Sequence, residues 1–439
     1  MFARTTTPWP LVALFTAGYL APYLLPTVVG RLDSGLPVSA TQAGAIGSAL
    51  LLSSASAGFL LASRVDRIGA RTLARAGLTL AVLGFGGAAL TTTVPAVVVG
   101  AVLGGFGSGT ATAVAATGIA AQREPHRVTT LGLLSVSALA GTVYLTVPHL
   151  GPGHGLPLAA IALTALAVWP LTARVPTRIP LPERHVSPRR EPLPHLRSGL
   201  LLAAALPCWS MAQNSLWGVS GRIGLTQAHL DEATVGIVFA VGLGAGLFGV
   251  VAAGALGPRF GLALPIGAGT ALIAVCIALS ASATDLTTFA VGEIAWNAVY
   301  PVVLSYVIGL AASLDPRGRW AVLVGSASSL GTAAGPLAGS LLSTWAGFPA
   351  MGLFLAAGLL VVAVPMTTVA VRAGRSRTPE VTAVTAVTGG MGITEVTGIT
   401  EVTGITGITE VAGITEVTEI VEIAVDTPAL EQQAYDTTD

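Results

Sequence analysis

One acidic residue lies deep inside an apolar stretch of this 439-residue sequence. Glu293 is the only ionisable residue well inside such a stretch, and Trp296, Asn297 and Tyr300 follow it at helical spacing. At about 100° per residue, these four side chains fall within an arc of roughly 100° on one helix face. A carboxylate at membrane depth is costly and usually functional, so we expect Glu293 to bind a proton or a cation.

Two further apolar stretches carry amphipathic side chains at helical spacing. They are Trp209, Gln213 and Trp217 with the neighbouring Asn214, and Tyr19 with Tyr23. Together with the Glu293 face they predict a cavity of aromatic rings, amides and one acid, without Lys or Arg. Such a cavity suits a neutral, amphipathic or cationic organic molecule better than an anion. Trp and Tyr also gather at membrane interfaces, which is the alternative explanation for each aromatic residue.

The composition excludes a water-soluble globule. Hydrophobic residues make up 53% of the chain, charged residues only 10%, and the mean hydropathy is +0.78. A soluble domain carries roughly 25% charged residues. The 21 basic residues, all of them arginine, balance 21 acidic ones, so no basic field is available to bind nucleic acid. We expect an all-α integral membrane protein that contacts the lipid bilayer.

Twelve apolar runs approach or exceed the length of a membrane helix, which needs roughly 20 residues. They cover residues 8–29, 42–63, 75–93, 95–119, 128–148, 155–173, 198–218, 234–256, 262–282, 287–311, 320–343 and 348–371. The long proline-rich connection after the sixth run divides them into two sets. We expect a six-helix bundle over residues 1–173, a linker over 174–197, a second six-helix bundle over 198–377 and a separate tail over 378–439.

The positions of the arginines predict how the chain crosses the membrane. With twelve spans, 19 of the 21 arginines fall on the side that holds both termini. Only Arg31 and Arg222 fall on the other side, near the ends of the first and seventh spans. Because cytoplasmic loops are enriched in Lys and Arg, we expect both termini to be cytoplasmic, in the plasma (inner) membrane.

A short motif follows the second run and returns after the eighth. Residues 62–71 and 254–261 share the pattern small-x-x-x-(Asp or Pro)-Arg-x-Gly, at equivalent places in the two bundles. The first copy supplies Asp66, Arg67, Gly69 and Arg71, and the second supplies Arg259. Such a loop needs glycine where the chain reverses, and its carboxylate can pair with arginine or cap a helix.

With this motif, twelve spans and a basic middle loop, the chain resembles the major facilitator superfamily over residues 1–377. The resemblance implies two pseudo-symmetric bundles and a central cavity lined by spans one, four, seven and ten. It also implies that Asp66, Arg67, Gly69, Arg71 and Arg259 form a conformational latch that holds one transport state closed. The alternative is that the arginines only fix topology. A second pattern, Gly331-x-x-x-Gly335-Pro336-x-x-Gly339 in span eleven, is similar to one that drug antiporters of this superfamily carry in span five. We expect export rather than import.

These features predict a secondary active transporter of a small organic solute that is coupled to protons and acts as a monomer. No phosphate-binding G-x-x-x-x-G-K-(S/T) loop occurs in the sequence, so the chain does not pump with ATP by itself. We expect no enzyme, no cofactor and no metal site, because Cys208 and Cys276 lie in apolar runs and no histidine lies in mid-span. The alternative function is a non-transporting membrane sensor or scaffold on the same fold.

The tail has a different composition from the rest of the chain. Residues 378–439 hold eleven of the 21 acidic residues, no arginine and near-repeats of Gly-Ile-Thr-Glu-Val-Thr. A segment with so few large apolar residues cannot bury a core, so we expect disorder. The alternative is that the β-branched repeat stacks as a small β-solenoid or pairs with another chain.

Overall fold

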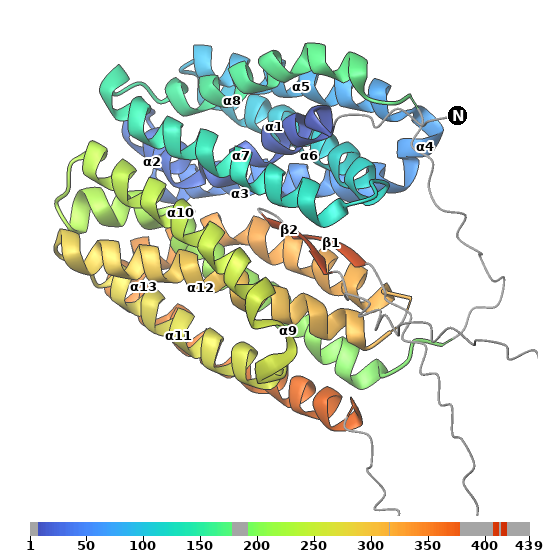
Figure 1. The fold of residues 1–439 in the computed structure, drawn as a ribbon. Helices are drawn as coiled ribbons and strands as arrows, with labels where there is room; N and C mark the ends of the chain where they lie inside the picture. Colours follow the sequence, from blue (N-terminus) through green and yellow to red (C-terminus); the bar gives the residue numbers. More distant parts are fainter. Residues whose placement is uncertain (1–7, 178–191, 316, 378–406, 412–413, 419–439) are drawn as a thin grey trace, which may run out of the picture.

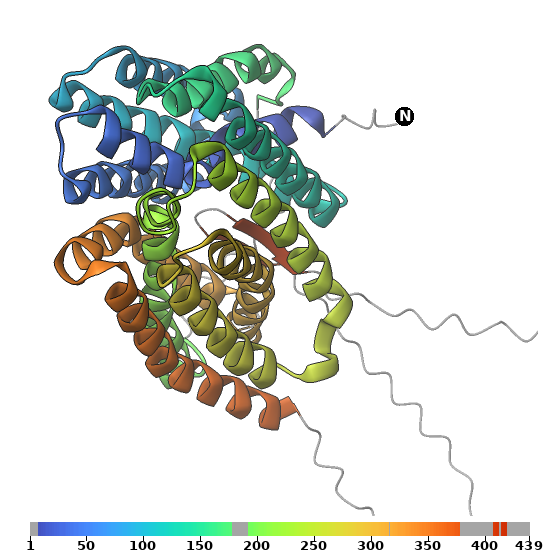
Figure 2. The same ribbon diagram turned by 90° about the vertical axis from the view of Figure 1, so that its left-hand side faces the viewer.

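The computed structural model describes residues 8–177, 192–315, 317–377, 407–411 and 414–418. Over these residues the regular structure is helical apart from one short hairpin, which confirms the all-α membrane fold (Figure 1). The helices form two groups, which Figure 2 shows one above the other. We call them the N-terminal half and the C-terminal half.

Within the described residues the N-terminal half consists of eight α-helices, several of which join into bent spans. They are α1 Trp9–Tyr23, α2 Leu25–Gly35, α3 Ala40–Leu61, α4 Val65–Ile68, α5 Ala70–Leu90, α6 Val94–Ala120, α7 Pro125–Thr146 and α8 Gly155–Val168. The helices α1 and α2 meet at an angle of 48°. Pro22 and Pro26 flank this bend, and proline interrupts helical hydrogen bonding.

The C-terminal half consists of five helices in the described residues. They are α9 Leu196–Arg222, α10 Glu232–Leu256, α11 Ala263–Ala281, α12 Leu286–Ser313 and α13 Arg319–Arg377. The last of these is really two helices, because Gly347 has a φ of 80° that only glycine adopts easily. The break falls in the short gap that the sequence predicts between the last two spans.

The number of membrane spans is close to the expected twelve. Nine helices of the described residues are long and apolar enough to cross a membrane, and the bent pair α1 and α2 makes a tenth. Dividing α13 at Gly347 adds another, and α9 is the remaining candidate. Its amide and serine side chains lower its hydropathy, because this helix faces the protein interior rather than lipid.

Two helices that begin on the same side of the molecule share one capping device. Asp231 accepts a hydrogen bond from the backbone N–H of Thr234 at the start of α10, and Asp285 accepts one from Thr288 at the start of α12. These side chains satisfy N–H groups that have no partner within the helix. The position of each aspartate in the sequence therefore determines where its helix begins.

Small residues bring the helices of the C-terminal half into close contact. A Cβ atom added at Gly331, Gly335 or Gly339 would come within 2.0–2.5 Å of atoms of α9. The glycine stripe of the sequence therefore lets α13 lie directly on α9. In the same way a Cβ at Gly292 would lie 2.8 Å from Ser280, so this glycine lets α12 approach α11.

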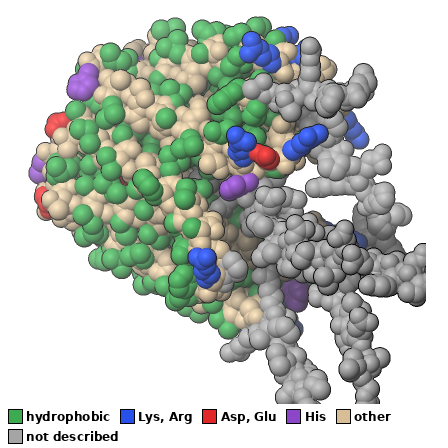
Figure 3. All heavy atoms as spheres, viewed as in Figure 1, with side chains coloured by type: hydrophobic (Ala, Val, Ile, Leu, Met, Phe, Trp, Pro, Cys, Tyr) green, Lys and Arg blue, Asp and Glu red, His purple; other side chains and the backbone are tan. Residues whose placement is uncertain are grey.

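The surface and the helix ends distinguish two faces of the molecule. Hydrophobic side chains cover the visible sides of both halves, as expected for contact with lipid (Figure 3). One end carries most of the arginines, including those of residues 62–75, and we call it the arginine-rich face. The opposite end, where α2 ends and α10 and α12 begin, is called the arginine-poor face.

The two halves meet mainly toward the arginine-poor face. There a Cβ at Gly44 of α3 would lie 2.3 Å from Ser340 of α13, and a Cβ at Gly236 of α10 would lie 2.3 Å from the carbonyl oxygen of Tyr144 in α7. Toward the arginine-rich face the helices of the two halves diverge (Figure 1).

Part of the tail forms a hairpin near this divergence. Strands β1 Gly407–Val411 and β2 Ile414–Thr418 pair antiparallel, with Gly407 opposite Thr418. β1 lies against α13 and β2 against α7, so the hairpin contacts both halves. The other tail residues, on which the prediction of disorder also falls, lie outside the described residues.

Candidate binding cavity

A cavity of about 90 Å³ lies between the two halves, close to the middle of the long helices. The N-terminal half contributes Pro22 and Tyr23 of α1 and Leu133 and Ser137 of α7; the C-terminal half contributes Gln213, Asn214 and Trp217 of α9, Leu243, Gly246, Leu247 and Val250 of α10, and Trp296, Asn297, Tyr300 and Pro301 of α12. The stretches predicted for spans one, seven and ten thus meet at one site. Mid-depth between two halves is where transporters of repeated architecture bind their substrates.

One hydrogen bond across the halves holds an aromatic ring at the cavity. The indole N–H of Trp217 donates to the carbonyl oxygen of Pro22 at 3.1 Å. Pro26 lies four residues beyond Pro22 and has no N–H with which to continue the helical bonding. The bend in the first span therefore leaves a carbonyl oxygen available to a side chain of the other half.

A second pair of side chains joins α9 to α12. The indole N–H of Trp296 donates to Oε1 of Gln213, and the rings of Trp296 and Trp217 lie 5.6 Å apart. Trp209 stacks on Tyr300 with ring centres 5.3 Å apart and planes inclined by 13°. Trp209 is fully buried and does not line the cavity, so it supports Tyr300 from behind.

Of the remaining predicted residues of spans one, seven and ten, Asn214, Asn297 and Tyr23 line the cavity and Tyr19 does not. The Asn214 amide donates to the carbonyl of Ser210 and to Thr332 of α13, and Asn297 donates to the backbone of Glu293. Both asparagines also line the cavity. Tyr19 is buried beside Phe15, with ring centres 4.4 Å apart, and is not a lining residue. Tyr23 lines the cavity, and its backbone carbonyl accepts the hydroxyl of Tyr144.

Glu293 lies beside the cavity rather than in its lining. Its side chain is completely buried between α9, α11 and α12. Oε1 accepts hydrogen bonds from the hydroxyls of Ser220 at 2.7 Å and Ser280 at 2.6 Å. Oε2 has no partner, and Glu293 forms no ion pair with any described residue. A buried carboxylate without a cation is costly, so binding of a proton there removes an uncompensated charge.

In the part of the chain that the structure describes, two ion pairs connect the halves on the arginine-poor face. In the first, Arg31 of α2 contacts Glu232 of α10, with Nε and Oε1 2.5 Å apart. The same guanidinium donates to the carbonyl oxygens of Val147, Gly151 and Gly153, which lie in the N-terminal half. Arg31 is almost completely buried and the Glu232 side chain is 35% exposed, so the pair is partly buried between the halves.

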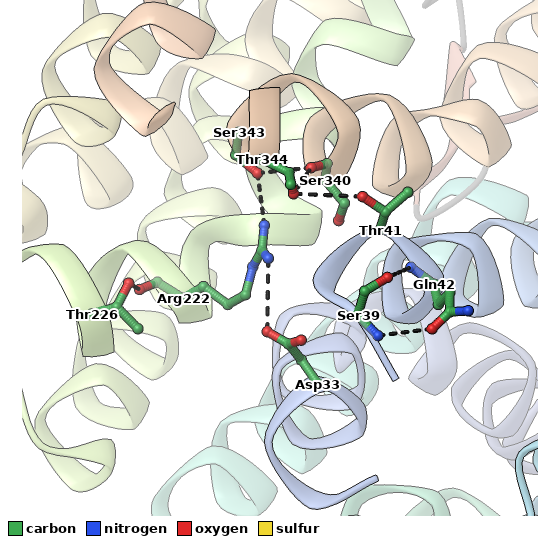
Figure 4. Close-up of polar contacts among 9 residues, drawn as sticks. All are labelled: Asp33, Ser39, Thr41, Gln42, Arg222, Thr226, Ser340, Ser343 and Thr344. Atoms are coloured by element: carbon green, nitrogen blue, oxygen red, sulfur yellow. Dashed lines mark hydrogen bonds and ion pairs between the residues drawn. The ribbon is translucent and has the colours of Figure 1, made fainter. Parts of the chain in front are cut away.

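The second ion pair has the opposite arrangement of charges. Arg222 at the end of α9 lies 3.7 Å from Asp33 of α2 and donates to Ser343 of α13 at 2.7 Å (Figure 4). Its guanidinium also lies 5.5 Å from the centre of the Phe348 ring. We call the two ion pairs the outer pairs. They stabilise the contact of the halves on the arginine-poor face.

The residues expected to form a latch lie on the opposite face. Arg71 donates to the carbonyl of Val175, within its own half, and Arg259 donates to Ala255 one turn back in its own helix. Arg67 is exposed, and Gly69 turns the chain with a φ of 98°. Asp66 has one buried carboxylate oxygen without a partner and forms no ion pair with a described residue. In this conformation none of these contacts crosses between the halves.

Several residues of the candidate site escaped the sequence analysis. Ser220 and Ser280, the partners of Glu293, are single serines in apolar runs and carry no recognisable pattern. Ser137 and the apolar cavity residues of α7 and α10 look like lipid-facing residues in sequence. Arg31 and Arg222 carry a signal that could have pointed to the outer pairs, because among the described residues they are the only arginines on the arginine-poor face. Among the described residues no group of three His, Cys, Asp or Glu side chains could hold a metal ion.

A mid-depth cavity between two helical halves that are closed together on one face is the architecture of a membrane transport protein. The chain belongs to the Major Facilitator Superfamily, whose family model matches residues 7–314. No curated protein matches the sequence.

Solved structures of transporters share the fold. The human organic anion transporter MFSD10 (TETRAN) matches with a TM-score of 0.61 and 17% identity, over 83% of this chain and 100% of that one. The peptide transporter POT in complex with alafosfalin matches with a TM-score of 0.66 and 14% identity, over 84% and 95%. The nucleoside transporter NupG matches with a TM-score of 0.62 and 14% identity, over 82% and 99%. At these identities the likeness concerns the fold.

Proposed function

We propose that the chain is a proton-coupled secondary transporter that moves a small neutral or cationic organic solute, with export favoured over import. It acts as a monomer in the plasma (inner) membrane with both termini in the cytoplasm, so the arginine-rich face is the cytoplasmic one. The arginine distribution supports the orientation. The glycine-proline pattern of α13, similar to that of drug antiporters, supports the direction.

The observation that carries the proposal is the position of Glu293 one helical turn from two cavity residues. Trp296 and Asn297 follow Glu293 on α12 and line the cavity. Glu293 is completely buried, and one of its oxygens has no partner. A solute in the cavity and a proton on Glu293 therefore act on the same turn of one helix.

A short connection links Glu293 to an outer pair. Ser220 donates to Glu293, and two residues later in α9 Arg222 contacts Asp33 of the other half. Protonation of Glu293 weakens the charge-assisted hydrogen bond from Ser220 and so weakens the attachment of the end of α9 to α12. In this way a proton biases the contact between the halves, which is the two-state element that a carrier needs.

Transport into proteoliposomes tests the proposal. The purified protein is reconstituted, and uptake from a panel of labelled organic solutes is measured with and without a pH gradient. The wild type is expected to accumulate a solute only when a gradient is present. The Glu293→Gln variant keeps the side-chain shape without titrating, so it should lose accumulation and retain exchange at equal concentrations.

Two outcomes would contradict the proposal. If no solute moves under any gradient while the protein remains folded, the chain is a sensor or scaffold. If Glu293→Gln still concentrates solute in response to a pH gradient, proton coupling resides elsewhere. Glu124→Gln is a matched control, because it makes the same substitution at an exposed residue outside the cavity.

A further inference from the structure

The side-chain amide of Gln213 is only partly hydrogen-bonded at the cavity wall: its oxygen is paired, whereas its NH₂ group is not. Gln213 is completely buried and lines the cavity. Its Oε1 accepts the indole N–H of Trp296, whereas its Nε2 has no hydrogen-bond partner among the described residues. An unpaired buried amide group costs roughly 1–3 kcal/mol, which a ligand can recover by pairing with it.

The chemistry of Trp296 decides which end of the amide is free. An indole N–H only donates, so the atom that faces it must be the amide oxygen. The free end is therefore the NH₂ group, which only donates. A ligand that pairs with Gln213 must offer an acceptor, such as a carbonyl oxygen or a ring nitrogen. An ammonium group cannot pair there, because it has donors alone.

The surroundings of this amide are flat, aromatic and without cations. Trp217 and Tyr300 both lie next to Trp296, with ring centres 5.6 Å and 5.9 Å from it. Trp217 is fixed by its bond to Pro22, and Tyr300 is fixed by stacking on Trp209. No arginine is among the lining residues of the cavity. Fixed ring faces favour a planar apolar body, and the lack of a counter-charge disfavours an anion.

We infer that the solute is an uncharged planar aromatic molecule whose hydrogen-bond acceptor binds Nε2 of Gln213, with its ring against Trp217, Trp296 and Tyr300. This inference rests on the proposed transport function and narrows its substrate class. The direction of the hydrogen bond from Trp296 to Gln213 leaves a donor free, and this donor favours a solute that carries an acceptor over an organic ammonium ion.

Three bicyclic probes of similar size distinguish these classes. Coumarin offers a carbonyl acceptor, naphthalene offers neither donor nor acceptor, and 1-naphthylmethylammonium offers donors only. Binding to the full-length protein in lipid nanodiscs is measured by equilibrium dialysis. The wild type is expected to bind coumarin roughly tenfold more tightly than naphthalene, and the ammonium probe most weakly, as one recovered hydrogen bond predicts.

Two variants of Gln213 test the direction of the bond. Gln213→Glu keeps an oxygen for Trp296 and replaces the free donor with an acceptor, so it should weaken coumarin binding at least tenfold and strengthen binding of the ammonium probe. Gln213→Leu removes both ends and should abolish the difference between coumarin and naphthalene. Gln122→Glu repeats the first substitution outside the cavity, where the amide bonds to Gly118, and should change nothing.

Each other outcome overturns the inference. Equal binding of the three probes, preference for the ammonium probe, or no binding of any probe by folded wild-type protein would each exclude an acceptor-bearing aromatic solute. Thermal unfolding of every variant separates loss of binding from loss of fold. Gradient-driven accumulation of another solute, lost in Glu293→Gln, would leave the transport function intact while this substrate class fails.

Discussion

Arg222 and Asp33 form an ion pair between the two halves, with Nη1 and Oδ2 3.7 Å apart. The arginine belongs to the C-terminal half and the acid to the N-terminal half, whereas the neighbouring pair of Arg31 and Glu232 has the reverse arrangement. Each half therefore offers one cation and one anion to the other. Closure of this face requires both halves to be in register, because a shifted contact would place like charges together.

Loss of one outer pair should open the arginine-poor face. A partly buried ion pair contributes about 1 kcal/mol, so Asp33→Asn should raise the open population about fivefold. Gly30 lines a second cavity, of about 100 Å³, beside Arg31 and Glu232, and a Cβ there meets nothing within 4 Å, so Gly30→Cys provides a label site. Labelling by a membrane-impermeant maleimide, after replacement of both native cysteines by alanine, measures the population.

Two controls change other charges: one breaks an ion pair within one half, and the other reverses the outer pair. Glu124→Gln breaks an exposed pair with Arg127 within one half, and it should leave labelling unchanged. Reversing the outer pair, with Asp33→Arg and Arg222→Asp together, should restore part of the protection. Identical labelling in Asp33→Asn and the wild type would show that the outer pair does not stabilise closure.

Gly292→Ala should disturb the surroundings of Glu293 without touching its carboxylate. The added Cβ would lie 2.8 Å from backbone and side-chain atoms of Ser280, so α11 and α12 must separate. Overpacking of this kind costs roughly 1–3 kcal/mol, and it should lower the melting temperature and impair gradient-driven transport. Gly309→Ala on the same helix meets no atom within 4 Å and should leave both unchanged. Equal melting temperatures for the two variants would refute the packing explanation.

Asp66→Asn should slow transport several-fold while expression stays normal. In the present conformation Asp66 has a buried oxygen without a partner, so its carboxylate is available to contacts that form when the arginine-rich face closes. Losing those contacts unbalances the two states of the carrier. Exchange rates in proteoliposomes, compared with those of Glu124→Gln on the same face, provide the measurement. Unchanged rates in both directions would reduce the motif to a topology signal.

The caps of α10 and α12 predict a pH dependence of stability. Hydrogen bonds from the side chain and backbone of Thr234 lower the pKa of Asp231, and those from the backbone and side chain of Thr288 lower the pKa of Asp285, below the ordinary value of 3.8. A lowered carboxyl pKa adds stability that is present above the ordinary value and is lost as the pH falls through the lowered one.

The measurement compares melting temperatures at two pH values. Asp285→Ala should melt below the wild type at pH 7, and the difference should shrink as the pH falls through the lowered pKa of Asp285 in the wild type. Asp285→Asn keeps an acceptor that does not titrate, so its cap should be independent of pH. A constant difference between the alanine variant and the wild type would exclude the cap as its cause.

Truncation after Arg377 should leave a folded transporter. The helices of the C-terminal half end with α13, and the hairpin of β1 and β2 lies between the two halves without belonging to either bundle. We expect an unchanged melting temperature and retained transport in proteoliposomes. Replacing the tail by a Gly-Ser linker of equal length controls for the bulk of the chain. Failure of the truncated protein to fold would show that the tail belongs to the structure.

Hydropathy predicted the helices well because lipid demands long apolar runs with internal hydrogen bonds. The same rule explains why α9 is the least apolar of the long helices, since its face with Gln213 and Asn214 contacts protein and a cavity instead of lipid. The predicted break between the last two spans occurs at Gly347, where a positive φ separates the parts of α13. Both results depend on local sequence alone.

The cavity was predictable only on its polar side. Gln213, Trp296 and Tyr300 stand out in apolar runs, whereas the lining residues Leu243 and Leu247 of α10 do not. An apolar side chain serves equally well against lipid, a neighbouring helix or a solute, so its type carries no information about which one it meets. The contacts of Glu293 with Ser220 and of Arg31 with Glu232 join residues 73 and 201 positions apart, and only the folded chain brings them together.

The unequal share of the two halves in the cavity also affects how such a carrier diversifies. The N-terminal half offers the Pro22 carbonyl, Tyr23, Leu133 and Ser137, whereas the amides and indoles belong to the C-terminal half. A main-chain carbonyl is present whatever residue carries it, so that side of the cavity tolerates sequence drift. Recombination that replaces the C-terminal half can therefore give a descendant a new solute while it inherits the old partner half unchanged.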